Sequence, residues 1–481
     1  MTLPDGYELE TIANSSMGPD TELEATDLST RPSGTLLVTT RGGELWEYTP
    51  GSEEWTLKTD GLHQTTGVWT DEMGDPDEIY VAQKPRLTRL VDDTDDAEID
   101  LYETIANDWG ITGDYHEWVY GPVRDSEGNL YINLSLAAEG TSPCSGIMTI
   151  HYPDSYRGWH VKITPDGEFV PWANGFRSPL GIGINDDDEV FYSDQQGDFV
   201  PVCHVAHLTE GSFHGHPISL GDDPDWPDYE NLCSSDTDLD DYLEARKPPV
   251  AWIPYNLVTS GGGVTFDLAG NFGPFEGQAF LGCQENNNLT RVSMEEVGGA
   301  YQGAVFPFSD IDDFQCGTVA EAFSGDGSSI YVAETSRGFG DGDPEPYGVE
   351  RVTYDGETTP FAMHSIEIRS SGFRVNFTKP ADAGAAGDAG NYDLSHWTYN
   401  YHSSYGSGRV NESSVEVTSA SVVDGGSAVE LDLPSVGPAD VPGTRTPQGR
   451  VYEISLDGIT AGDGSGMAHS VGWYTVNRVP N

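Results

Sequence analysis

The 481-residue sequence predicts an all-β protein, a six-bladed β-propeller followed by an immunoglobulin-like β-sandwich. Three observations predict this fold class. A strand–turn–strand unit recurs six times, 58 glycines and 30 prolines are spread along the chain as turn residues, and the pattern changes near residue 360 to strict alternation of apolar and polar residues. We therefore expect a propeller over residues 1–360 and a sandwich over residues 361–481.

Each repeat pairs an apolar strand with a second strand across a turn rich in Asp and Gly. Degenerate units of this length, each forming a four-stranded sheet, are typical of propellers. The opening stretch 7–12 is expected to complete the last blade and close the ring. The repeats are centred on residues 34–48, 77–90, 127–163, 189–194, 278–292 and 329–352.

The wide spacing between the third, fourth and fifth repeats predicts long insertions, which usually decorate the face that binds a ligand. Residues 239–245 are expected to form one short helix. In the last quarter of the chain the alternating pattern predicts antiparallel strands with one buried face, over residues 365–368, 372–377, 428–433 and 451–454.

The charge is far from balanced. Eighty acidic residues face 22 basic ones, of which five are lysines, and the net charge is −58 with a pI near 4.1. This dispersed acidic surface is typical of a halophilic protein, because molar salt shortens the screening length to about 3 Å. The lack of basic patches argues against nucleic acid or an anionic membrane surface as a partner. No apolar run is long enough for a membrane span.

Five cysteines are present, and none forms a Cys-x-x-Cys pair that would indicate zinc or haem. Their spacing suggests Cys203–Cys233 and Cys283–Cys316 disulfides with Cys144 free; five free thiols in a reducing cytoplasm are the alternative. The chain opens directly into a strand-like stretch, as a mature protein without its leader would. We therefore expect an extracellular or cell-surface location, with the cytoplasm as the alternative.

Two loops carry candidate catalytic or ligand-binding residues. His116 lies between carboxylates and aromatic residues, a setting suited to a general base, although a hydrogen-bonded loop histidine is the simpler interpretation. Arg177 lies in a loop shaped by Gly and Pro, where a guanidinium can hold an anionic cofactor or a carboxylate through two hydrogen bonds. Asp194, Gly197 and Asp198 offer oxygen ligands for calcium, or they form an ordinary turn.

Two further motifs are weaker. His214 and His216 could ligate a metal, but no third ligand is obvious, and we interpret them as part of a tight structural loop. Arg337 ends a repeat strand, where it could point into the central funnel or form a surface salt bridge.

The order of these motifs resembles the soluble quinoprotein glucose/sorbosone dehydrogenases. His116 is followed by Gly-Phe-Arg-Ser-Pro-Leu-Gly-Ile-Gly at 175–183, Asp-Gln-Gln-Gly-Asp-Phe at 194–199 and Gly-Ser-Phe-His-Gly-His-Pro at 211–217. The chain is most similar to planctomycete-type relatives that add a C-terminal domain, through Phe-Thr-Lys-Pro at 377–380 and Tyr-His-Ser-Ser-Tyr-Gly-Ser at 401–407. Ser178 departs from the family's asparagine, and no cofactor-binding lysine can be placed.

The resemblance implies a dehydrogenase that oxidises an aldose sugar or polyol with pyrroloquinoline quinone (PQQ) and Ca²⁺. His116 would take the hydroxyl proton while hydride passes to the quinone, and Arg177 would stabilise the developing oxyanion. Arg177, Arg337 and Gln195 would bind the cofactor, and Asp194, Gly197 and Asp198 would hold the calcium ion. On this hypothesis His116, Arg177 and Arg337 converge in one funnel.

Two other functions stay open. The propeller could bind carbohydrate or a protein partner without catalysis, with Trp397, Tyr399, Tyr401 and Tyr405 as sugar-binding aromatics or as sandwich core. It could instead be a polysaccharide lyase or hydrolase of propeller type that uses His116 as base and Tyr115 as acid.

Overall fold

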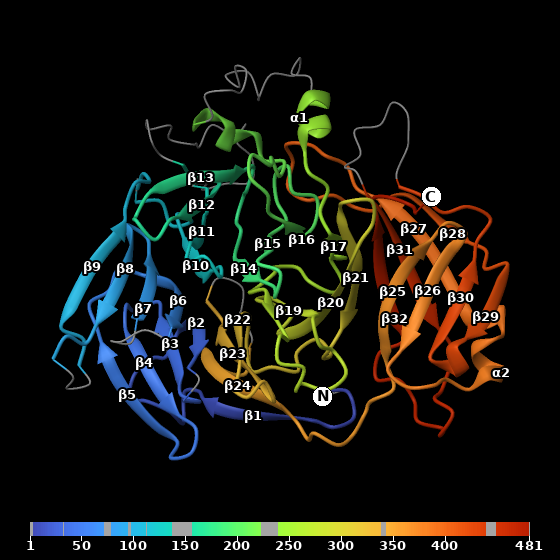
Figure 1. Cartoon of the computed structure of the whole chain (residues 1–481), viewed down its shortest axis with the longest axis horizontal. Coiled ribbons are helices and arrows are strands. Elements are labelled where there is room, and N and C mark those ends of the chain that lie inside the picture. Colours follow the sequence, from blue (N-terminus) through green and yellow to red (C-terminus); the bar gives the residue numbers. More distant parts are fainter. Residues whose placement is uncertain are drawn as a thin grey trace.

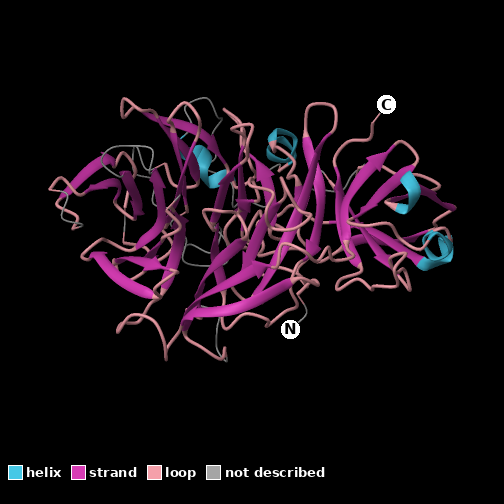
Figure 2. Cartoon of the chain, turned by 60° about the horizontal axis from the view of Figure 1, so that its bottom comes forward, coloured by secondary structure: helices cyan, strands magenta, loops and turns pink. Residues whose placement is uncertain are grey.

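The structure is a computed structural model. It describes residues 3–31, 33–71, 78–94, 98–111, 113–136, 156–222, 239–337, 343–438 and 449–480. The described chain is nearly all β, with a few short helical turns at its periphery (Figures 1 and 2). The helix predicted over residues 239–245 forms as α1 (Asp240–Ala245). No described helix is both long and apolar enough to cross a membrane. The other helical elements of the described residues are α2 (Ala383–Ala386) and the 3₁₀ turns η2 (Pro217–Asp222), η3 (Ala389–Asn391) and η4 (Asp424–Gly426).

The first three quarters of the chain form six four-stranded antiparallel units. Units one to three consist of β2 (Ala25–Thr30), β3 (Leu36–Thr40), β4 (Leu45–Thr49) and β5 (Glu54–Thr59); β6 (Thr65–Asp71), β7 (Glu78–Gln83), β8 (Arg86–Val91) and β9 (Leu101–Ala106); and β10 (Val119–Arg124), β11 (Leu130–Leu134), β12 (Trp159–Ile163) and β13 (Phe169–Asn174). Units four to six consist of β14 (Gly181–Ile184), β15 (Val190–Asp194), β16 (His204–His207) and β17 (Ala251–Trp252); β18 (Thr265–Phe266), β19 (Ala279–Cys283), β20 (Asn288–Glu296) and β21 (Tyr301–Pro307); and β22 (Thr318–Phe323), β23 (Ser329–Thr335), β24 (Tyr347–Tyr354) and β1 (Tyr7–Ala13).

The innermost strands contact one another in a closed cycle, in the order β2, β6, β10, β14, β18, β22 and back to β2. The strand predicted at residues 7–12 forms as β1 and completes the sixth unit, with Tyr7 opposite Tyr354 and Leu9 opposite Val352. The first and last segments of the ring therefore share one sheet.

Strand β23 is apolar on both faces because it lies between two neighbouring units of the ring. Ile330 and Val332 pack into the core against the fifth unit, whereas Tyr331 and Ala333 pack into the core against the first unit. Because alternate side chains of a strand point to opposite faces, a sheet stacked between two neighbours needs apolar residues at every position.

The last quarter of the chain forms two further layers of strands beside the ring (Figure 1). One layer extends the fifth unit, because β21 pairs with β32. Ala304 and Phe306 of β21 face the core between the two layers, and Val305 faces the core of the ring. The layers consist of β25 (Met363–Arg369), β26 (Gly372–Phe377), β30 (Ala428–Asp432) and β29 (Ser419–Val423), and of β32 (Val471–Val476), β31 (Arg450–Leu456), β27 (Tyr392–Thr398) and β28 (Val410–Val415).

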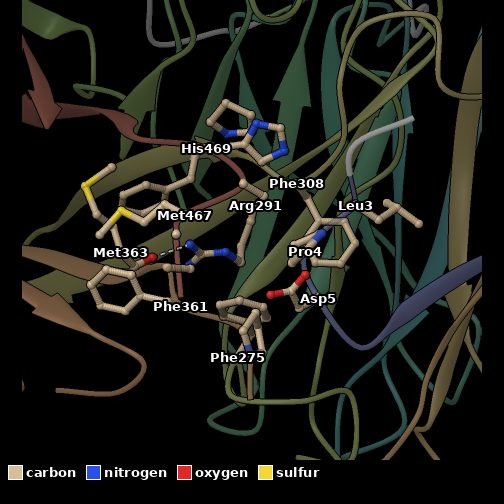
Figure 3. A pocket seen from close by; sticks show the side chains of 16 residues that line it. Leu3, Pro4, Asp5, Phe275, Arg291, Phe308, Phe361, Met363, Met467 and His469 are labelled. Carbon is tan, nitrogen blue, oxygen red and sulfur yellow. Dashed lines mark hydrogen bonds between the residues drawn. The ribbon is translucent and has the colours of Figure 1, made fainter. Parts of the chain in front are cut away.

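A buried arginine lies where the C-terminal layers meet the ring (Figure 3). The Arg291 guanidinium stacks between the rings of Phe275 and Phe306, at 4.2 and 4.5 Å from their centroids. It donates to the backbone oxygens of Met363 and His364, just after the chain leaves the ring. Hydrogen bonds to carbonyl groups thus fasten the start of the C-terminal layers to β20.

The predicted Cys283–Cys316 disulfide is wrong. Cys203, Cys283 and Cys316 are buried free thiols. The Cys316 thiol contacts the carboxylate of Glu334 at 3.8 Å, whereas Cys283 sulfur accepts a hydrogen bond from the backbone N–H of Asn286, so the two thiols face different partners. Cys144 and Cys233 lie outside the described residues.

Candidate functional site

A cavity of about 450 Å³ lies over the innermost strands of the ring. All six units line it, five of them through residues of or beside their innermost strands: Thr26 of β2, Thr66 of β6, Tyr120 of β10, Leu180 beside β14 and Val319 of β22. The same five residues line a second cavity of about 500 Å³. These five residues therefore border both cavities.

The first cavity brings together residues from distant parts of the sequence. His116, Arg177, Gln195 and Arg337 all line it. The three residues that the sequence predicts to converge, His116, Arg177 and Arg337, are thus neighbours of one space large enough for a small organic ligand.

The His116 side chain is 49% exposed at this cavity. Its Nδ1 atom lies 3.6 Å from Oδ1 of Asp114, and the same carboxylate accepts a hydrogen bond from the His116 backbone N–H at 2.8 Å. The ring of Tyr115 packs edge-on against the imidazole at 5.2 Å. A carboxylate beside one ring nitrogen can orient an imidazole that exchanges protons through the other.

Arg177 is held in place by carboxylates on both its backbone and its side chain. The backbone N–H of Arg177 donates to Asp194 Oδ2 at 2.9 Å, and that of Ser178 donates to Oδ1 at 2.7 Å. The Nε atom of Arg177 donates to Asp198 Oδ1 at 2.8 Å. No described residue accepts a hydrogen bond from the two terminal guanidinium nitrogens, which remain available to an anion in the cavity.

The turn beneath Arg177 needs glycine at position 197. A Cβ atom on Gly197 would lie 1.9 Å from Nε of Arg177, so any other residue would displace the guanidinium. Asp198 next to it accepts from both Arg177 and Nε2 of His216, the latter at 3.0 Å. Burial alone would raise the pKa of Asp198, but His216 and Arg177 outweigh it and lower the pKa.

The two histidines of the 211–217 loop have separate partners. His216 pairs with Asp198, whereas Nε2 of His214 lies 2.9 Å from the hydroxyl of Ser212. Burial lowers the pKa of His214 well below its usual value, so this imidazole is neutral in the interior. Both contacts agree with the interpretation of this segment as a structural loop.

The predicted calcium ligands are engaged by protein donors. Both oxygens of Asp194 accept backbone N–H groups, and burial raises the pKa of this carboxyl to about 6. The carbonyl of Gly197 accepts from the N–H groups of Gly406 and Val200, at 2.9 and 3.2 Å. Among the described residues, no group of three or more His, Cys, Asp or Glu side chains is arranged to hold a metal ion. These groups, as they are arranged, do not fit a Ca²⁺ site.

Arg337 and Gln195 make fewer contacts. One terminal nitrogen of Arg337 donates to both oxygens of Glu24, at 2.9 and 3.0 Å, so its charge is partly neutralised at the cavity wall. Gln195 donates to the carbonyl of Gly261 at the long distance of 3.5 Å.

The sequence analysis missed Arg41. Its guanidinium donates to the Tyr115 hydroxyl at 2.8 Å and lies 5.1 Å from the ring of Trp118. Its position in the repeat could have identified it. The residue that directly follows the second strand of a unit is Arg41, Gln195 or Gln284 in three of the units, and Arg337 lies two residues after β23, the second strand of the sixth unit. Side chains at this position reach the cavity in four of the six units.

Lys84, also missed, supports the loop that carries His116. Its ammonium donates to the backbone oxygens of Asp114 and Tyr115, at 2.9 and 3.0 Å, and lies 4.5 Å from the ring of Trp118. Burial lowers the pKa of Lys84. The lysine therefore acts on the loop rather than on the cavity itself.

The charged side chains that line the cavity are Glu24, Arg41, Arg177 and Arg337, together with His116. Three guanidinium groups line the cavity in a chain of net charge −58, and the carboxylates of Asp198 and Glu24 partly neutralise two of them. Such a concentration of positive charge favours an anionic ligand.

The C-terminal aromatic residues divide into two groups. Trp397, Tyr399 and Tyr401 are buried, which supports their interpretation as core. Tyr405 instead lines the cavity and is 48% exposed, with the Arg177 guanidinium 5.3 Å from its ring centroid.

No protein-family model and no curated protein matches the sequence. Solved structures with a similar fold include a Thermus thermophilus protein assigned as an oxidoreductase (glucose dehydrogenase), with 16% identity and a TM-score of 0.53 over 72% of this chain and 100% of that one. The PQQ domain of Coprinopsis cinerea pyranose dehydrogenase has 12% identity and a TM-score of 0.52, over 73% and 96% of the two chains. The PQQ-bound aldose sugar dehydrogenase of Streptomyces coelicolor has 15% identity and a TM-score of 0.50, over 73% and 99%. The ring of this chain therefore has the β-propeller fold of the PQQ-dependent sugar dehydrogenases.

Proposed function

We propose that this protein is an oxidoreductase that oxidises an aldose sugar or a related polyol with PQQ as its electron acceptor. The observation that carries the proposal is the convergence of His116 with the guanidinium groups of Arg41, Arg177 and Arg337 on one cavity. In this proposal the six units are the blades of a propeller over residues 1–360, and residues 361–481 form a β-sandwich.

The residues of the cavity fit the cofactor. PQQ carries three carboxylates, and an arginine fork is the protein group best shaped to bind a carboxylate through two hydrogen bonds. The terminal nitrogens of Arg177 form no hydrogen bond with a described side chain. Arg41 adds a second cation, whose guanidinium lies over the rings of Tyr115 and Trp118. When bound there, the quinone would supply the two-electron acceptor for the reaction.

His116 is the residue placed to move a proton. Asp114 lies beside its Nδ1 atom, so the imidazole can take the proton of a sugar hydroxyl at Nε2 while the substrate carbon loses hydride. Arg177 can stabilise negative charge that develops on the same oxygen. We assign no step to Ca²⁺, because Asp194, Gly197 and the Asp198 side chain are engaged with protein donors.

Calorimetric titration of the protein with PQQ in molar salt tests the proposal. We expect a micromolar or tighter Kd, weakened about 10- to 100-fold by Arg177→Ala, since a hydrogen bond to a charged group contributes about 1.5–3 kcal/mol. Arg369→Ala is the control, because Arg369 pairs with Glu430 in the C-terminal layers, away from the cavity. His116→Ala should retain binding and lower the rate of sugar oxidation about 100-fold or more. A protein that binds no PQQ contradicts the proposal.

A carbohydrate-binding protein without catalysis is the second candidate. Tyr115, Trp118, Tyr120 and Tyr405 line the same cavity, and aromatic faces suit sugar rings. Binding of sugars in the absence of PQQ, with no oxidation of any of them when PQQ is added, would favour this function.

A further inference from the structure

One loop of the C-terminal layers reaches the cavity of the ring. Residues 399–409, which connect β27 and β28, are called here the 399–409 loop. Its backbone is bonded to the turn that follows Arg177 and Asp194: Phe199 N–H donates to His402 oxygen at 2.9 Å, and Gly406 N–H donates to Gly197 oxygen at 2.9 Å. A third bond joins Ser407 N–H to Pro201 oxygen at 2.8 Å.

Tyr401 anchors this loop in the interior. Its side chain is buried, its ring packs 5.4 Å from Phe199 and 5.8 Å from the guanidinium of Arg246, and its hydroxyl donates to the carbonyl of Gly215. Phe199 directly follows Asp198, the residue that holds Arg177. The loop is therefore fixed to the element that positions the cavity arginine.

Tyr405 stands at the tip of the anchored segment. Its ring lies against the guanidinium of Arg177 at 5.3 Å, and partial burial raises the pKa of its hydroxyl. No described residue forms a hydrogen bond with that hydroxyl, so the contact with Arg177 is made by the ring. Tyr405 is 48% exposed and lines the cavity.

Two contacts thus fix the Arg177 side chain from different directions. Asp198, from the ring, accepts from Nε, and Tyr405, from the C-terminal layers, packs against the guanidinium. Arg177 held in this way lines the cavity, and its terminal nitrogens form no hydrogen bond with a described residue. Rigid preorganisation of a binding arginine raises affinity, because the ordering cost is met before the ligand arrives.

We propose that Tyr405 is a positioning residue of the cavity: the C-terminal layers complete the site in the ring by holding the Arg177 guanidinium toward an anionic ligand. Only the identity of that ligand, a PQQ carboxylate, rests on the proposed function. The C-terminal quarter of the chain then contributes a residue to the binding site of the ring.

The test compares Tyr405→Ala and Tyr405→Phe with the wild-type protein in a PQQ titration. Removal of the ring should raise the Kd about 3- to 10-fold, in the range of a partly desolvated cation–π contact, whereas the phenylalanine variant should stay within about twofold of wild type. Tyr102→Ala is the matched control, because Tyr102 has the same 48% exposure but does not line the cavity. Equal affinities of wild type and Tyr405→Ala overturn the proposal.

A second readout needs no ligand. Phenylglyoxal modifies accessible guanidinium groups, and peptide mapping by mass spectrometry gives the rate at Arg177 alone. We expect Tyr405→Ala to speed modification of Arg177 at least about threefold, with the rate at Arg369 unchanged. If wild-type protein binds no PQQ, the proposed function fails, and this rate decides the role of Tyr405 by itself: an unchanged rate at Arg177 overturns it.

Discussion

The Nε atom of Arg177 lies 2.8 Å from Oδ1 of Asp198, and the other oxygen of the same carboxylate lies 3.0 Å from Nε2 of His216. A single buried carboxylate thus joins the cavity arginine to the 211–217 loop. The Arg177 side chain leaves no room for a Cβ atom on Gly197, and the 399–409 loop bonds to the backbone of Gly197 and Phe199 on either side of Asp198.

Replacement of Asp198 by Asn should destabilise the fold by about 3 kcal/mol, because it leaves Arg177 and a buried His216 without their carboxylate. Denaturant unfolding at pH 7 in molar salt measures the change. Asp424→Asn, which removes the exposed partner of Arg374, should cost about 1 kcal/mol or less. If Asp198→Asn lowered the free energy of unfolding as little as Asp424→Asn does, Asp198 would not be the stabilising partner of Arg177 and His216.

The same carboxyl predicts a response to acid. The pKa of Asp198 is lower in the folded chain than the usual value near 3.9, so the folded state binds its proton less readily than the unfolded state does. Its contribution to stability is therefore complete above that usual pKa and is lost as the pH falls below it. The free energy of unfolding should fall more steeply between pH 4 and pH 2 in wild type than in Asp198→Asn.

Gly197→Ala should weaken the binding of PQQ. The new methyl group would lie 1.9 Å from Nε of Arg177 and force the guanidinium out of its place. We expect at least about a 10-fold higher Kd, comparable with the loss of a charged hydrogen bond. Gly408→Ala, in the 399–409 loop, meets nothing within 4 Å and should bind like wild type.

The buried carboxyl of Glu321 predicts a second effect of pH on stability, opposite in sign to that of Asp198. Burial, with a further contribution from Asp27, raises the pKa of Glu321 to about 8, and the backbone N–H of Gly282 offsets this only in part. Because the folded pKa exceeds the unfolded one, this group favours the fold when protonated, and its contribution declines as the pH rises from about 4.3 towards 8.

Glu321→Gln should therefore flatten the pH profile of stability, by up to about 1.4 kcal/mol per pH unit between pH 5 and pH 8, and should be more stable than wild type at pH 8. Glu54→Gln, at an exposed position of β5, serves as the control and should leave the profile unchanged. Parallel profiles for Glu321→Gln and wild type would show that the carboxyl does not titrate in this range.

The net charge of −58 predicts a strong dependence of stability on salt. Raising KCl from 0.1 M to 2 M shortens the screening length from about 10 Å to below about 3 Å, which removes most of the repulsion among surface carboxylates. We expect the Tm to rise by more than about 10 °C. Sucrose at matched osmolarity separates screening from solute exclusion, and an equal rise in sucrose would contradict an electrostatic origin.

Local sequence patterns were enough to predict the individual strands and turns. Apolar strands with Asp- and Gly-rich turns placed β3, β7, β19 and β23, because a period of two and a turn residue are properties of neighbours in the chain. The same reasoning identified Arg177 in its loop and the strand that closes the sixth unit. It did not find innermost strands such as β18, which has two residues and no periodicity to detect.

Contacts between residues far apart in the sequence depend on how the strands pair and pack in three dimensions. The pairing of β21 with β32 joins residues about 170 positions apart, and no local pattern specifies such a partner. The failed disulfide shows the same limit, since sequence spacing does not say which partners two thiols face. Arg41 reaches Tyr115, and Tyr405 reaches Arg177, because the closed ring and the extended fifth sheet bring their loops over one cavity. Local composition encodes strands and turns, whereas packing of buried surfaces fixes which loops become neighbours.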